Sequence, residues 1–150
     1  MTRTKASISC CFVWFRGSCL FFSKQLDDLA GMGQRFAPGD DLIFQLESGY
    51  GLLRILAIEG EGAETVWHLL AYDEFFPDIE SAERALVQRG SLRVREAHMA
   101  LTDRAFERTP AAQLGNRTVK DEELASYREW LKTEKRLVSD RSALLMLGIR

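Results

Sequence analysis

The sequence predicts an α+β domain, with either a small curled antiparallel sheet or an SH3-like barrel and two or three helices. Several short segments with strand-like apolar patterns follow one another, and glycine or proline turns separate them. Few helices are predicted between these strands. Consecutive strands are therefore expected to pair with their neighbours in an antiparallel sheet.

The first two strands are expected to form a hairpin. Residues 37–40 (Ala-Pro-Gly-Asp) give a turn signal, because proline presets φ and glycine accepts a positive φ. Residues 41–47 alternate between apolar and polar, and residues 50–59 resume an alternation after the break at Ser48 and Gly49. On the second strand, three apolar residues are predicted to share one face: Leu52, Leu56 and Ile58.

The third strand is predicted at residues 65–72, which are nearly all apolar. A strand that is apolar on both faces needs cover on both sides. We therefore expect a helix or a chain terminus to close one end of the curled sheet. A fourth, half-buried strand is predicted at residues 91–96, where apolar residues alternate with arginines.

The first predicted helix follows Asp78, which has the residue type that caps helix N-termini. It should run over residues 79–88, and Gly90 is a suitable residue to end it. Its apolar stripe is predicted to face the core and consists of Ile79, Ala82 and Leu86.

The second predicted helix starts from the capping-box spacing of Thr118 to Asp121 and extends to about Lys132. Its inward face should hold Leu124, Tyr127 and Leu131. The preceding segment, from Thr109 to Asn116, is predicted to be a loop, and residues 142–149 form either a last helix or a closing strand.

Charge and cysteine divide the chain into residues 1–31 and residues 32–150. The first segment has four basic and two acidic side chains (net +2) and all three cysteines, whereas the second has 16 basic and 20 acidic ones (net −4). We expect residues 1–31 to be a dispensable extension: a disordered tail, an upstream start of translation, or a poorly specified helix. A secretory signal is disfavoured, because Arg16 and Gly17 interrupt the apolar run. Residues 32–150 are expected to form a single domain without disulfides, which suits the cytoplasm.

Motifs for catalysis and metal binding are missing from the sequence. His68 is expected to be a hydrogen-bonded residue of the core, and His98 a surface residue near a strand end. No HExxH, paired-cysteine or GxSxG pattern occurs, so we predict neither a metal site nor a cofactor, and no enzyme activity. The chain has a formal net charge of only −2, which disfavours a general nucleic-acid binder.

Acidic and aromatic residues are concentrated at predicted strand ends. Asp40 and Asp41 are expected to be solvated there, and Asp73 and Glu74 to form part of an acidic rim. Phe75 and Phe76 follow these acids directly, and neighbours in an extended chain point in opposite directions. Either one ring is exposed, as in a binding hot spot, or the later helix covers it.

Three short motifs resemble immunity family twenty-six, a group of small bacterial proteins associated with polymorphic toxin systems. They are Pro38-Gly39-Asp40, then Gly49-Tyr50-Gly51 with Arg54, and later Leu114-Gly115-Asn116 before an acidic helix start. The resemblance covers roughly residues 35–131. It implies a cytoplasmic protein that binds a toxin domain and blocks it by occlusion.

We therefore predict a non-catalytic protein that neutralises a bacterial toxin domain. The predicted partner-binding residues are Tyr50, Arg54, Tyr72, Asp73, Glu74, Phe75 and Phe76. One alternative is an SH3-like regulatory module for peptides or single-stranded nucleic acid, with a local basic strip. This strip would be formed by Arg93, Arg95, Arg104, Arg108 and Arg117. The other alternative is a small hydrolase built on His68, Asp73 and Glu74.

Overall fold

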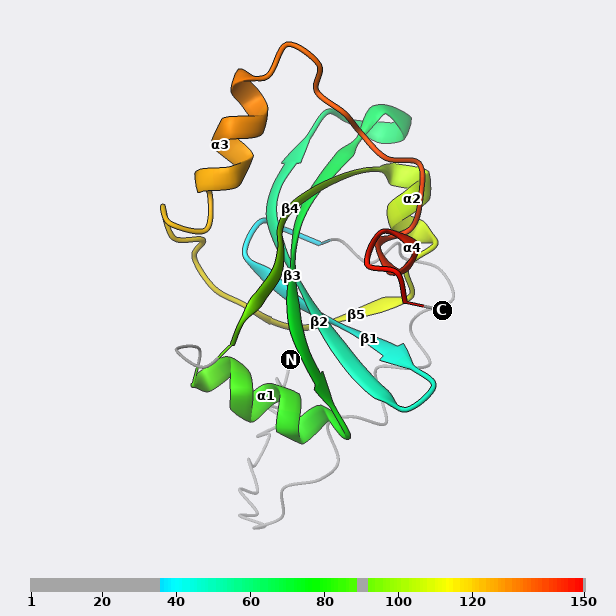
Figure 1. The fold of residues 1–150 in the computed structure, drawn as a ribbon, viewed down its shortest axis with the longest axis vertical. Coiled ribbons are helices and arrows are strands. Elements are labelled where there is room, and N and C mark those ends of the chain that lie inside the picture. The colour runs from blue at the N-terminus through cyan, green and yellow to red at the C-terminus, as the bar shows by residue number, and fades with distance from the viewer. Residues whose placement is uncertain (1–35, 89–91, 150) are drawn as a thin grey trace, which may run out of the picture. The chain divides into compact units, whose positions relative to one another are not determined.

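The computed structural model describes residues 36–88 and 92–149 and confirms the α+β class. Five antiparallel strands form one sheet with the order β4-β3-β2-β1-β5. In chain order the elements are β1 (Asp40–Leu46), β2 (Gly49–Glu59), the 3₁₀ turn η2 (Gly62–Glu64), β3 (Val66–Phe76), α1 (Ile79–Val87), β4 (Val94–Thr102), α2 (Asp103–Glu107), β5 (Ala111–Asn116), α3 (Ala125–Lys132) and α4 (Ala143–Met146). The sheet is curled but not closed, because β4 and β5 are its two edges; the SH3-like barrel is therefore not confirmed (Figure 1).

The predicted β1–β2 hairpin is confirmed, with Leu46 opposite Gly49. The turn before β1 needs a glycine, because Gly39 has a φ of 94°. The close packing of the hairpin also needs one at Gly51, where an added Cβ would lie 2.2 Å from Cζ of Phe44. The backbone conformation therefore requires glycine at residue 39, and side-chain packing requires it at residue 51.

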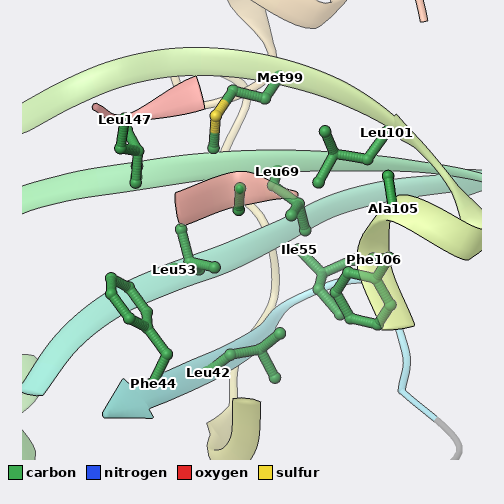
Figure 2. Close-up of a cluster of buried hydrophobic side chains, with 12 residues drawn as sticks. Leu42, Phe44, Leu53, Ile55, Leu69, Met99, Leu101, Ala105, Phe106 and Leu147 are labelled. Carbon is green, nitrogen blue, oxygen red and sulfur yellow. The ribbon is translucent and has the colours of Figure 1, made fainter. Parts of the chain in front are cut away.

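Helices cover both faces of the sheet, as the apolar β3 segment required: α1 and α3 lie on one side, α2 and α4 on the other (Figure 1). Two clusters of buried side chains result. The first, drawn in Figure 2, includes Leu42, Phe44, Leu53, Ile55, Leu69, Met99, Leu101 and Phe106. The second includes Ile43, Leu52, Leu56, Leu70, Tyr72, Ala82 and Leu86. Burial of both faces holds the sheet rigidly in place.

The prediction that Leu52, Leu56 and Ile58 share one face of β2 is wrong for Ile58. The register of β2 against β3 shifts between Ile55 and Ala57. As a result Ile58 packs with the first cluster, whereas Leu52 and Leu56 belong to the second. Such a bulge adds one residue to a strand and reverses the alternation beyond it.

The helix predictions are mostly confirmed. Asp78 caps α1 by accepting a hydrogen bond from the Ser81 N–H at 2.7 Å, and the predicted inward stripe packs on the second cluster. Gly90 lies outside the described residues. The later helix begins at Ala125, after a turn at residues 121–124, and so starts later than predicted. Residues 143–146 form a helix, which decides between the two expectations for the C-terminal segment.

Two predictions for residues 91–116 differ from the structure. The fourth strand is Val94–Thr102 rather than residues 91–96, and a short helix, Asp103–Glu107, follows it directly. Residues 111–116 form the edge strand β5 and not a loop, although alanine, glycine and asparagine favour strands weakly. Pairing with β1 supplies the hydrogen bonds that local propensity does not.

The predicted extension, residues 1–31, lies outside the described residues. Within the described part, packing begins at Phe36, whose ring meets those of Trp67 and Phe106 edge-on. No helix of the described residues is long and apolar enough to cross a membrane.

Candidate functional site

Arg54 is fully buried, so the structure removes it from the predicted partner-binding surface. Its guanidinium donates hydrogen bonds to Asp41 Oδ1 at 2.7 Å and to the Gly39 carbonyl at 3.2 Å. It also donates to the carbonyls of Arg117 and Thr118, at 3.1 and 3.2 Å. Arg54 therefore joins the β1–β2 hairpin to the segment that leads from β5 to α3.

Asp40 and Asp41 are buried as well, so the prediction that they are solvated is wrong. Asp40 accepts hydrogen bonds from the Ala37 N–H at 2.7 Å and from the side chains of Gln113 at 2.7 Å and Asn116 at 2.6 Å. Buried carboxylates need such partners, because each loses its hydration. These acids hold β5 against β1 and have a structural role.

Phe75 and Phe76 point in opposite directions, as expected for neighbours in an extended strand. Phe76 packs against the second cluster, whereas half of the Phe75 surface is exposed. Tyr72 is buried in the second cluster, which also removes it from the predicted surface, and Tyr50 is half-buried beside that cluster. Phe75 is therefore the exposed aromatic ring among the predicted binding residues.

Asp73 and Glu74 are held by Arg93 near the start of β4. The backbone N–H of Arg93 donates to Glu74 Oε1 at 2.9 Å, and its Nη2 lies 3.1 Å from Asp73 Oδ2. Arg95 adds a weaker contact, 3.9 Å from Asp73, and donates to the Leu147 carbonyl at 2.7 Å. These contacts order the charged side chains next to Phe75.

Two histidines lie side by side on β3 and β4, which the sequence analysis missed. His68 is fully buried, and its Nδ1 lies 3.0 Å from Nε2 of the half-buried His98. The rings stack at 5.2 Å between centroids, and Tyr127 and Trp130 of α3 pack on both of them. His98 is thus not a surface residue. The sequence signal for this group was the spacing of Tyr127 and Trp130, which are three residues apart and therefore lie on one face of a helix.

Glu59 completes this group, which we name the histidine cluster (Glu59, His68, His98, Tyr127 and Trp130). The Tyr127 hydroxyl donates to Glu59 Oε1 at 2.6 Å, and His68 Nε2 lies 3.8 Å from Glu59 Oε2. Electrostatics favours the tautomer in which His98 Nε2–H donates to His68 Nδ1. The His68 proton then sits on Nε2, towards the carboxylate.

Burial sets the proton affinities in the histidine cluster. Desolvation lowers the pKa of His68, although Glu59 opposes this effect. Desolvation, together with the neighbouring His68, lowers the pKa of His98 to about 4. Desolvation and the hydrogen bond to Glu59 raise the pKa of Tyr127 to about 12. Both rings are therefore neutral near pH 7.

The predicted hydrolase residues are not brought together. Asp73 follows His68 by five residues on β3, roughly 17 Å at a rise of about 3.3 Å per residue. Asp73 and Glu74 pair with Arg93, whereas His68 bonds to His98. Within the described ranges, no three histidine, cysteine or acidic side chains are grouped as ligands for a metal ion.

A pocket of about 200 Å³ lies beside β4, next to the histidine cluster. It is lined by residues 98–100 of β4, Trp130 of α3, residues 137–139 and Met146 of α4. Its lining is mainly apolar, and His98 is the member of the histidine pair that reaches it.

The arginines of the predicted basic strip lie on or beside different elements. Arg93 precedes β4 and Arg95 lies on it, and both pair with Asp73 of β3, whereas Arg104 lies on α2. Arg117 follows β5 and donates to the Leu86 carbonyl. The arginines are thus spread over separate elements, and several are already engaged.

Comparison with known proteins gave no match: no family model, no curated protein and no solved structure is similar to this chain. The resemblance to immunity family twenty-six accordingly stays a prediction.

Proposed function

We propose that the protein is a non-catalytic, cytoplasmic binding protein that neutralises a bacterial toxin domain by covering its active surface. The observation that carries this proposal is Phe75, a half-exposed aromatic ring at the end of β3 whose acidic neighbours are held by ion pairs. Exposed aromatic anchors next to ordered charges are typical of binding hot spots.

Rigidity supports occlusion as the mechanism. The ring of Phe76 anchors this end of β3 in the core, and Arg93 fixes Asp73 and Glu74. A surface that is ordered before binding loses little side-chain entropy when it meets its partner. Arg93 and Arg95 offset the charge of the acidic pair, so this surface presents charges of both signs next to Phe75.

The state of the titratable groups supports a role without turnover. His68 and His98 hydrogen-bond to each other, and Tyr127 donates to Glu59. The low pKa of His98 and the high pKa of Tyr127 leave both far from the value that suits a general acid or base at neutral pH.

Co-expression with a toxin domain encoded next to this gene tests the proposal. The parent protein should restore growth, and Phe75→Asp should abolish protection. Val87→Asp is the matched control, since Val87 is an exposed apolar residue at the end of α1, without the ion pairs of Asp73 and Glu74. Growth that the parent does not restore, or equal protection by both variants, would contradict the proposal.

A pull-down from the native host, followed by mass spectrometry, identifies the partner. We expect one stoichiometric protein that the Phe75→Asp variant fails to retain. Salt-sensitive binding to single-stranded oligonucleotides by the parent protein, without a protein partner, would instead support the regulatory alternative.

A further inference from the structure

The pocket at the β4 edge has the size of a site for one side chain. Its volume of about 200 Å³ is below the roughly 300–1,000 Å³ of typical small-molecule sites. Exposed apolar side chains surround it: Leu137, Val138 and Met146 all line the pocket and are at least partly open to solvent. Grouped exposed apolar residues of this kind mark interaction sites.

The backbone beside the pocket already pairs with an extended segment. Ser139 N–H donates to the Ala100 carbonyl at 2.8 Å, and the Ser139 carbonyl accepts from the Thr102 N–H at 3.0 Å. Backbone groups of alternate strand residues point to the same side. Ala100 and Thr102 therefore both face the side of β4 on which Ser139 lies, whereas the register of β4 against β3 shifts between Met99 and Glu96, beside the pocket.

Residues 132–141, which form one side of the pocket through residues 137–139 and are called its rim below, are basic overall. Residues 132–141 contain four basic and two acidic side chains, a net charge of +2 in a chain whose net charge is −2. The basic members are all exposed: Lys132, Lys135, Arg136 and Arg141. Arg136 also lies over the Trp130 ring, 5.7 Å from its centroid, so positive charge stands at the pocket wall. An acidic ligand is complementary to this rim.

We propose that this pocket binds one apolar side chain of an extended, acidic segment of a partner protein, which lies along the edge of β4 next to Ser139. The apolar side chain would contact Leu137, Val138 and Met146, and the carboxylates of the segment would meet the basic rim. This surface is distinct from the one around Phe75 and does not depend on the toxin proposal.

The test uses a capped synthetic heptapeptide, Glu-Asp-Val-Leu-Val-Asp-Glu, titrated into the full chain and followed by amide NMR spectra. Two matched peptides replace the central leucine with serine or all four acids with lysine. We expect shifts at residues 98–100 and at the Trp130 indole, and an affinity at least about tenfold weaker for each control peptide. Higher salt should weaken binding of the acidic peptide.

Two variants of α4 decide whether the pocket is the site. Met146→Asp places a charge at the pocket lining, whereas Leu145→Asp makes the same change on a neighbouring residue that does not line it. Both side chains are exposed, so both variants should fold, as a thermal melt will check. Only Met146→Asp should reduce peptide affinity, by about tenfold or more.

Four outcomes would overturn the proposal. They are no binding at millimolar peptide, equal binding of all three peptides, equal loss in both variants, and shifts that depend on protein concentration alone. The last would assign the pocket to a second copy of this chain.

Discussion

The guanidinium of Arg54 lies 2.7 Å from the carboxylate of Asp41, and both side chains are withdrawn from solvent. Arg117 approaches the other oxygen of Asp41 at 3.6 Å, and Glu123 approaches Nε of Arg54 at 3.1 Å. This group of charges joins β1 and β2 to the chain that follows β5. A residue that the sequence placed on a binding surface is therefore part of the interior.

Arg54→Lys should strongly destabilise the fold. Lysine keeps the charge but cannot reach Asp41 and three separate carbonyls with one ammonium group. Leaving one buried acceptor without a donor costs about 1–3 kcal/mol, and Arg54 serves several acceptors. Urea unfolding measures the change, with the exposed Arg93→Lys as control. A loss below about 1 kcal/mol would show that the buried network contributes little.

Gly51→Ala should destabilise the β1–β2 hairpin. The new Cβ would meet the Phe44 ring, which is buried, and overpacking of this kind costs about 1–3 kcal/mol. The smaller side chain in Phe44→Leu should recover part of that loss when combined with Gly51→Ala. A strictly additive double mutant would mean that the two residues do not interact.

The free energy of unfolding should decrease at acid pH because of His68 and His98. The pKa of both histidines is lowered in the fold, so below about pH 6.5 the unfolded chain binds protons that the folded chain does not. Their contribution is therefore intact above pH 6.5 and declines as the pH falls towards 4. Urea unfolding at several pH values should give a shallower decline for His98→Gln than for the parent. Parallel curves would contradict this account.

Removing residues 1–31 should leave a cooperative thermal melt. Residues 36–88 and 92–149 supply two clusters of buried side chains, which lie on the two faces of the sheet. Circular dichroism of the truncated chain measures this directly. A broad, non-cooperative transition would show that the first segment contributes to the fold.

The sequence was informative where local signals agree with tertiary packing. The β1–β2 hairpin, the Asp78 cap and the opposite directions of Phe75 and Phe76 depend on neighbours in the chain, so pattern and turn chemistry predict them. Strand β5 depends on β1, about seventy residues earlier, and its own residues favour strands weakly.

The candidate site was less predictable, because long-range contacts decide it. His68 and His98 are thirty residues apart, and only the register of β3 against β4 brings their rings together. Arg54 looked like a surface residue because arginine is rarely buried, whereas its acceptors are mostly backbone carbonyls supplied by residues 117 and 118. Side-chain spacing does not reveal such carbonyls.

The parallel bridge between Ser139 and Leu101 also bears on aggregation. An uncovered edge strand is a template for stacking with other chains, as in cross-β fibrils. Residues near Ser139 shield the Ala100–Thr102 end of β4, and the exposed charges of Arg95 and Glu96 stand at the other end. Removing the chain beyond residue 136 would therefore expose the backbone of the Ala100–Thr102 end of β4 and favour aggregation.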